Sequence, residues 1–196
     1  MSGPDRRSVT IAGHTGDVVA ARAGLTADNP TVRAAAIGAL ERLGELTDDE
    51  LRTALADPDV TVRRRACEIA AGHRDIDLVA ALADTDPRVV EVAAWACGEH
   101  ESNRDAVLSA LIALAETADD ALVREAAVAS LGAIGDERAV PTIVAACADK
   151  PAVRRRAVLA LAPFDGDDVE AAIERALTDR DWQVRQAAED LRRAQS

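Results

Sequence analysis

The chain has 196 residues, of which 48% are hydrophobic and only 2% are aromatic, and its formal net charge is −12. This hydrophobic content argues against a disordered chain, and the shortage of aromatic rings predicts a core of closely packed Ala, Val, Leu and Ile. Because phosphates are bound mainly by Lys and Arg, the excess of 35 acidic over 23 basic residues opposes nucleic-acid binding.

The N-terminal residues 1–14 precede any repeated pattern, and we expect them to form a short, partly flexible tail. They lack the apolar run of a signal peptide, and nowhere does the chain hold the roughly 18 consecutive apolar residues of a membrane span. We therefore expect a soluble cytoplasmic protein in which residues 15–196 form a single domain.

A pattern centred on a valine recurs six times, at intervals of 27 to 34 residues. The anchor residues are Val32, Val62, Val89, Val123, Val153 and Val184. A polar turn such as ADPDVT precedes each anchor, where Asp can cap a helix and Pro fits its first turn, and an Ala follows four residues after the anchor. Before each turn lies another amphipathic stretch, for example DDELRTALA or DLVAALA. Each repeat is therefore predicted to be a helix, a tight turn and a helix.

A two-helix unit of about 30 residues cannot bury its own apolar face, so neighbouring units must stack. The segments DPDVTVRRRACEIA, DDALVREAAVASLGAIGDERAVPTIVAA and DRDWQVRQAAEDL resemble HEAT repeats, in particular the short type first noted in phycobilisome lyases. The resemblance extends from Asp17 to about Arg193. It implies an all-α fold, namely a right-handed α-solenoid of six two-helix HEAT-like repeats (an armadillo/HEAT superhelix), and we expect it to be a monomer.

The resemblance also implies that the arginine after each anchor valine joins an aspartate of the preceding turn in a hydrogen-bonded ladder between repeats. The matching arginines are Arg33, Arg63, Arg124, Arg154 and Arg185. The third repeat has Val90 at this position, so we expect the ladder to be interrupted there. The first arginine of each VRRRA segment is therefore assigned a structural role.

At about 100° per residue, the positions two and six after each anchor point away from the shared core, onto the surface that is concave in HEAT solenoids. Position two reads Ala34, Arg64, Glu91, Glu125, Arg155 and Gln186. Arg64 can meet Glu91 of the next repeat, and Arg155 can meet Glu125. Two interpretations stay open: these arginines form self-satisfied surface pairs, or they clamp an acidic ligand.

Position six reads Gly38, Glu68, Trp95, Ala129, Leu159 and Asp190, so the central repeats present apolar residues between acidic flanks. An apolar centre with a polar rim is typical of an interface, and Trp is a favoured anchor there. The alternative is that Trp95 fills a groove between small alanines. Trp182 lies in the last polar turn, and we expect it to pack as a cap.

Enzymatic interpretations find little support. Deoxyhypusine hydroxylase resembles this architecture but binds its metals through repeated His-Glu pairs, whereas this sequence has only His100-Glu101. The phycobilisome-lyase resemblance rests on structural residues of GDERAVP, so it does not imply lyase activity. HEAT-like alkylpurine DNA glycosylases use a basic groove, and the acidic charge of this chain argues against that activity. The three cysteines lack CxxC spacing and are interpreted as small buried hydrophobic residues. We therefore assign no catalytic residue, cofactor or metal ligand.

The sequence favours a non-catalytic scaffold or adaptor that binds a neutral or basic protein or peptide, not nucleic acid or a membrane. The predicted binding residues are Trp95, Leu159, Glu91, Glu125, Arg64 and Arg155. The alternative is an accessory factor, resembling HEAT-type bilin lyases or chaperones, that presents a small molecule to another protein. A pocket with convergent polar groups would favour the alternative, and an open groove would favour the scaffold.

Overall fold

The computed structural model describes residues 4–99 and 104–194, which form α-helices and short 3₁₀ turns without any strand. The α-helices are α1 (Arg6–Thr15), α2 (Val18–Ala23), α3 (Pro30–Leu43), α4 (Asp48–Leu55), α5 (Val60–Ala70), α6 (Pro87–Cys97), α7 (Arg104–Thr117), α8 (Ala121–Ile134), α9 (Val140–Ala146), α10 (Pro151–Ala160), α11 (Asp167–Leu177) and α12 (Trp182–Ala194). The 3₁₀ turns are η1 (Gly24–Thr26), η2 (Ala81–Ala83) and η3 (Glu137–Ala139).

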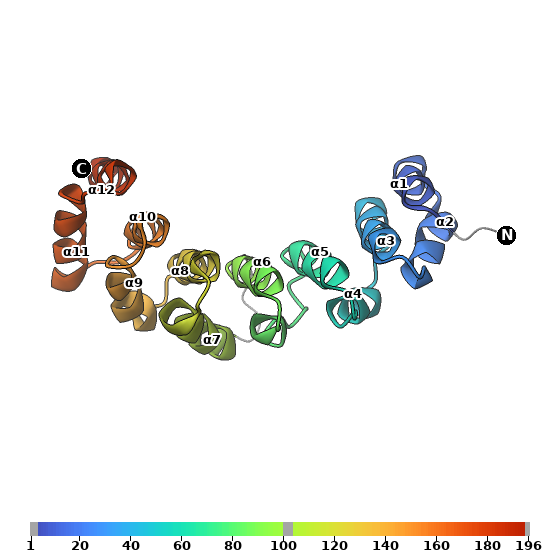
Figure 1. Ribbon diagram of the computed structural model, residues 1–196, viewed down its shortest axis with the longest axis horizontal. Helices are drawn as coiled ribbons and strands as arrows, with labels where there is room; N and C mark the ends of the chain where they lie inside the picture. The colour runs from blue at the N-terminus through green and yellow to red at the C-terminus, as the bar shows by residue number, and fades with distance from the viewer. Residues whose placement is uncertain (1–3, 100–103, 195–196) are drawn as a thin grey trace.

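The helices lie in two rows along one curved path (Figure 1). The inner row, on the concave side of the arc, holds α1, α3, α5, α6, α8, α10 and α12, and the outer row holds α2, α4, α7, α9 and α11. Each anchor valine lies in the first turn of an inner-row helix, so the second helix of each repeat lines the concave surface. The predicted α-solenoid of two-helix repeats is confirmed.

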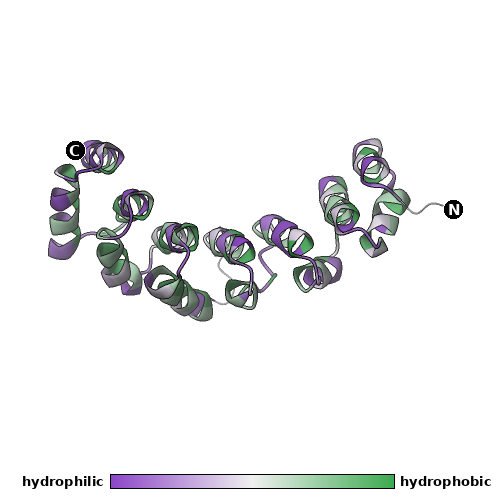
Figure 2. Cartoon of the chain, viewed as in Figure 1, coloured by the Kyte–Doolittle hydropathy of each residue, from purple (hydrophilic) through white to green (hydrophobic). Residues whose placement is uncertain are grey.

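The core lies between the two rows. All six anchor valines are buried, and so are the alanines four residues after them. These alanines are Ala36, Ala66, Ala93, Ala127, Ala157 and Ala188. Small side chains let the helices approach closely: a Cβ on Gly132 of α8 would lie 2.7 Å from the Cα of Ala160 on α10. In Figure 2, the helices of the inner row carry hydrophobic and hydrophilic residues on different sides, which is the pattern that stacking requires.

The N-terminal residues differ from the predicted tail. Arg6–Thr15 form α1, and the Asp5 side chain caps this helix. Val9 and Ala12 are buried in a small apolar cluster that they share with α3. Gly13 permits the close approach, because a Cβ there would lie only 2.8 Å from the Cβ of Ala39 on α3. The tail prediction is therefore wrong over these residues, and α1 extends the inner row by one helix.

The first half of the third repeat is also shorter than predicted. The stretch DLVAALA contains only the single 3₁₀ turn Ala81–Ala83 instead of a full helix. Ile76, Leu78 and Leu82 are nevertheless buried in the main core. This segment therefore covers the core with three apolar side chains rather than with a helical face.

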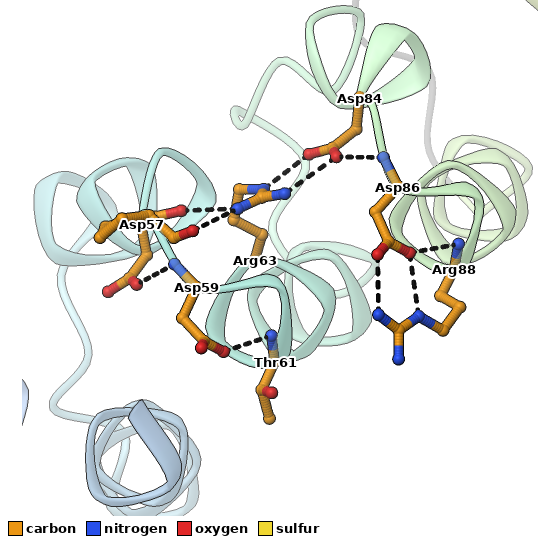
Figure 3. A network of polar contacts seen from close by, with 8 residues as sticks. Asp57, Asp59, Thr61, Arg63, Asp84, Asp86 and Arg88 are labelled. Carbon is orange, nitrogen blue, oxygen red and sulfur yellow. Dashed lines mark hydrogen bonds and ion pairs between the residues drawn. The ribbon is translucent and has the colours of Figure 1, made fainter. Parts of the chain in front are cut away.

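Arginine and aspartate side chains link successive repeats (Figure 3). Nε and Nη2 of Arg63 donate to the two carboxylate oxygens of Asp84, at 2.6 and 3.0 Å, and Nη1 donates to the carbonyl oxygens of Asp57 and Pro58. Asp84 also accepts from the backbone N–H of Asp86 at 2.9 Å. Because Asp84 belongs to the following turn, the predicted direction of the ladder is wrong: the following turn supplies the carboxylate, and the preceding turn supplies carbonyl groups.

The same bidentate contact, which we call a rung, occurs at three further repeat junctions. The pairs are Arg33–Asp57, Arg124–Asp149 and Arg154–Asp179. Arg185 keeps the contact to its own turn, where its Nη1 donates to the carbonyl oxygen of Asp179 at 2.7 Å. Hydrogen bonds from their arginine partners lower the pKa of Asp84, Asp149 and Asp179 below the usual aspartate range.

The expected interruption of the ladder affects both partners of the missing rung. Val90 replaces the arginine on α6 and is buried. In the next turn, Ala118 stands five residues before its anchor, the position that Asp57 and Asp84 occupy in their turns. Since a half-buried charge without its partner would destabilise the fold, the absence of both groups together leaves nothing unpaired.

Candidate functional site: the concave groove

Three adjoining hollows follow the inner row across the described residues, and we name them by position. The N-terminal hollow lies over α1, α3 and α5, the central hollow over α5, α6, α8 and α10, and the C-terminal hollow over α8 and α10. Their volumes are about 430, 460 and 490 Å³ respectively. Glu68 lines the first two hollows, and Ala129 and Arg156 line the last two. The hollows therefore form one continuous groove along the concave surface.

The central hollow has an apolar floor. Trp95 of α6 is 48% exposed and Leu122 of α8 is 56% exposed, and both line this hollow. Val92, Ala126 and Ala129 complete the floor between them. Because about half of the Trp95 side chain stays open to solvent, the ring borders the hollow rather than filling it. Exposed large apolar side chains gathered in a concavity are typical of a binding surface.

Carboxylates surround this apolar floor. Glu68, Glu91 and Glu125 all line the central hollow. Two of them have ion-pair partners: Nη2 of Arg156 lies 3.6 Å from Oε1 of Glu125, and Glu68 pairs with Arg64 and Arg65 of its own helix. Within the described residues, Glu91 has no ion-pair partner, and Nε of Arg156 is buried without a hydrogen bond. The central hollow therefore offers negative charge beside an aromatic face, which suits a cationic group.

The predicted binding residues separate along the groove. Trp95, Glu91 and Glu125 meet in the central hollow. Leu159 lines the C-terminal hollow and Arg64 lines the N-terminal hollow, whereas Arg155 lines none of the three. The structure thus brings three of the six together, and their role in binding stays a prediction.

The two expected ion pairs have other partners. Nη2 of Arg64 lies 3.1 Å from Oε1 of Glu68, one helical turn away, rather than meeting Glu91. At the other end of the groove, Arg156 faces Glu125 in place of Arg155. Residues four apart on one helix are neighbours, which explains why Arg64 pairs with Glu68 rather than with Glu91.

Leu122 and Arg156 belong to the groove but were missed in the sequence. Leu122 stands one residue before its anchor, and Arg156 three residues after its own. Positions one before, three after and six after an anchor share one helical face, because their spacing is three to four residues. Reading these positions together would have identified Leu122, which is the large apolar residue among six otherwise small or polar residues at that position.

Trp182 does not pack as a cap. It is the first residue of α12, and its side chain is 64% exposed. The expectation of a packed tryptophan is therefore wrong. The same position is occupied by Pro, Val or Ala in the other repeats.

The remaining reactive side chains are placed for packing. Burial raises the pKa of the Cys67 and Cys97 thiols to about 12, so both stay neutral at pH 7 and pack as small apolar groups, as predicted. Cys147 is only half-buried, so the prediction of a buried cysteine is wrong there. Across residues 4–99 and 104–194, no three His, Cys, Asp or Glu side chains are grouped so that they could hold a metal ion. The His100-Glu101 pair lies outside the described residues. Among residues 4–99 and 104–194, none of the helices has both the length and the apolar character that a membrane span needs.

Comparison with known families and structures agrees with this architecture. Residues 76–152 match the family model for HEAT repeats. YibA from Escherichia coli is similar in structure, with a TM-score of 0.64 and 22% identity over 81% of this chain and 62% of YibA. The chain therefore spans less than two thirds of YibA. Among curated proteins, none matches the sequence significantly.

Two further solved structures are similar. The designed armadillo repeat protein YIII(Dq.V1)4CPAF, solved in complex with peptide (KR)4, has a TM-score of 0.61 and 19% identity over 96% of this chain and 98% of its own. Human deoxyhypusine hydroxylase has a TM-score of 0.50 and 21% identity over 96% of this chain and 77% of its own. At these identities the similarities describe the fold, an armadillo-like array of helical repeats.

Proposed function

The chain is a HEAT-repeat protein, and we propose that it is a non-catalytic binding module that holds an extended basic segment of a partner protein in the central hollow. The observation that carries the proposal is the half-exposed Trp95, which lies beside Leu122 with three carboxylates around both. An apolar anchor within a charged rim is the arrangement that protein interfaces use.

The chemistry of the central hollow selects a basic partner. The aliphatic stem of a Lys or Arg side chain would cover Trp95 and Leu122, and its charged head would reach Glu91 or Glu125. The carboxylate of Glu91 has no competing ion pair in the described structure, so binding would not first have to break one. The designed armadillo protein with a similar fold was solved with the basic peptide (KR)4, which supports this class of ligand.

The groove has an open form that suits an extended chain. The three hollows join end to end along the inner row rather than closing into one deep cavity. An open groove favours a scaffold over the alternative of an accessory factor for a small molecule, because small-molecule sites enclose most of their ligand. We therefore place the partner segment along the groove, across α6 and α8.

Fluorescence anisotropy with a labelled (KR)4 peptide tests the proposal. Glu91→Gln combined with Glu125→Gln is expected to weaken binding about tenfold or more and to reduce its salt dependence, since two charge contacts are lost. The matched control is Glu45→Gln with Glu137→Gln, which removes the same charge at exposed positions outside the groove. Equal losses in both variants would mean that only net charge matters, and the proposal would be abandoned.

A second measurement locates the peptide. In a Trp182→Phe background Trp95 is the remaining tryptophan, because the chain has two, so its emission reports the central hollow directly. Peptide binding is expected to change this emission with the same midpoint as the anisotropy. An unchanged emission on saturation would place the peptide elsewhere. A small molecule that copurifies and binds in place of the peptide would favour the accessory factor.

A further inference from the structure

The N-terminal hollow differs in charge from the rest of the molecule. Four arginines line it: Arg6 from α1, Arg42 from α3, and Arg64 and Arg65 from α5. Its one carboxylate, Glu68, is shared by Arg64 at 3.1 Å and Arg65 at 2.8 Å. The lining therefore carries more positive than negative charge, in a chain whose net charge is −12. Such a local reversal is a signature of a site for an anion.

The guanidinium groups are the charged donors that remain for a ligand, and the Thr61 hydroxyl also lines the hollow. The hydroxyl groups of Thr10 and Thr31, which also line the hollow, already donate to the Arg6 carbonyl oxygen and to the Asn29 side chain. Within the described residues, Arg6 and Arg42 make no ion pair. Two guanidinium groups are therefore without a counter-charge, and two more share one carboxylate.

Two glycines make room for these arginines. A Cβ on Gly38 would lie 3.0 Å from Nη2 of Arg65, and a Cβ on Gly13 would lie 2.8 Å from Nη1 of Arg42. Each of these two guanidinium groups therefore lies against a helix at a residue that has no side chain. The arrangement depends on α1, because this helix contributes both Arg6 and Gly13.

We propose that the N-terminal hollow binds a phosphoryl dianion, as in a phosphate monoester or a diphosphate. Guanidinium groups donate pairs of hydrogen bonds that match phosphate oxygens, and a ligand held by donors alone must be an acceptor. The volume of about 430 Å³ exceeds that of a single phosphate, so an attached organic group or a second phosphate fits as well. This proposal does not rest on peptide binding in the central hollow, where the charge has the opposite sign.

Calorimetric titration with two probes tests the site and distinguishes two possible sources of the phosphoryl group. Pyrophosphate represents a free small ligand, and a short phosphoserine peptide without other charged side chains represents a modified partner. The site is supported if either probe binds and the binding is lost in the variant Arg64→Gln with Arg65→Gln. The probe that binds more tightly shows whether the natural ligand is a small molecule or a phosphorylated partner. If neither probe binds at low ionic strength, the proposal is overturned.

Substitutions with opposite expected effects make the test specific. Arg64→Gln with Arg65→Gln is expected to weaken binding about tenfold or more, and Glu68→Gln is expected to strengthen it severalfold, because the competing carboxylate is removed. Misfolding cannot produce the gain. Arg7→Gln with Arg180→Gln is the control, since these exposed arginines lie outside the hollow. A loss in the control equal to that in the test variant, or no gain with Glu68→Gln, overturns the proposal.

Discussion

The junctions between repeats are of two kinds. Where α3 meets α5, or α10 meets α12, an arginine of one repeat donates two hydrogen bonds to an aspartate of the next. Where α6 meets α8, at the middle of the arc, valine and alanine stand in the two positions of the rung. That junction instead has a neutral buried contact, in which the Ser130 hydroxyl donates to the carbonyl oxygen of Ala94 at 2.6 Å.

The difference shows that a junction can form without a rung, and that the arginine and the aspartate are absent together where the rung is missing. The central junction packs tightly without it: a Cβ on Gly98 would lie 3.0 Å from Oγ of Ser130, so α6 and α8 approach closely at this point. The same two helices carry Trp95, Leu122 and Glu125 on their concave side. The proposed binding surface therefore lies over the junction that is held by packing and a neutral hydrogen bond.

The largest expected effect comes from breaking a rung. Arg154→Ala removes a buried guanidinium that bonds both Asp179 and the carbonyl oxygen of Asp149, and we expect it to lower the free energy of unfolding by about 3 kcal/mol. Urea denaturation followed by circular dichroism measures this loss. Arg185→Ala is the matched control, because Arg185 has the turn contact but no rung, and its cost should be about 1 kcal/mol. Equal losses would show that the carboxylate contact contributes nothing.

Installing the missing rung sharpens the comparison. Val90→Arg alone should destabilise the protein, because it places a charge without a partner in a buried position, and Ala118→Asp alone should bring no gain. Together they should recover stability, with a coupling energy of about 2 kcal/mol in a double-mutant cycle. Thermal and urea unfolding of the four proteins gives this coupling. A coupling near zero would mean that the central junction cannot accept the geometry seen at the other four.

Acid should remove the contribution that the rungs make to the free energy of unfolding. Hydrogen bonds from the arginines of the rungs lower the pKa of Asp84, Asp149 and Asp179 below the usual aspartate range. A lowered pKa in the folded state stabilises the protein above the unfolded value, and this contribution fades as the pH falls through the folded value. The stability difference between wild type and Arg154→Ala should therefore be constant near neutral pH and shrink below about pH 4. A difference that persists undiminished at pH 2 would contradict this origin.

The smallest effect is expected at the central junction. Ser130→Ala removes the hydrogen bond to Ala94 but leaves the packing of α6 against α8, so the cost should be about 1 kcal/mol. Ser130→Val adds bulk at the point where Gly98 approaches, and it should cost more than the alanine variant. Urea unfolding compares the two. If both variants have the same free energy of unfolding as the wild type, the hydrogen bond from Ser130 does not stabilise this junction.

Much of the fold could be predicted because the repeat pattern is local. The anchor valines and the alanines four residues later are buried as expected, and Val90 marked the interruption of the ladder in advance. Helix α1 was missed because it packs through Val9, Ala12 and Gly13, which make a weak apolar pattern. For the groove, helical periodicity placed Trp95, Glu91 and Glu125 on one surface, but it did not identify the neighbours of Arg64 and Arg155.

The sequence by itself determined the solenoid, the register of its repeats and the concave row of second helices, because helical spacing and turn residues act over a few residues each. Only the tertiary structure decided which turn completes each rung and which carboxylate each long arginine reaches. It also decided that α1 brings Arg6 to Arg42, Arg64 and Arg65. These outcomes depend on the stacking of neighbouring repeats and on flexible side chains with several partners in range, which no spacing within one helix specifies.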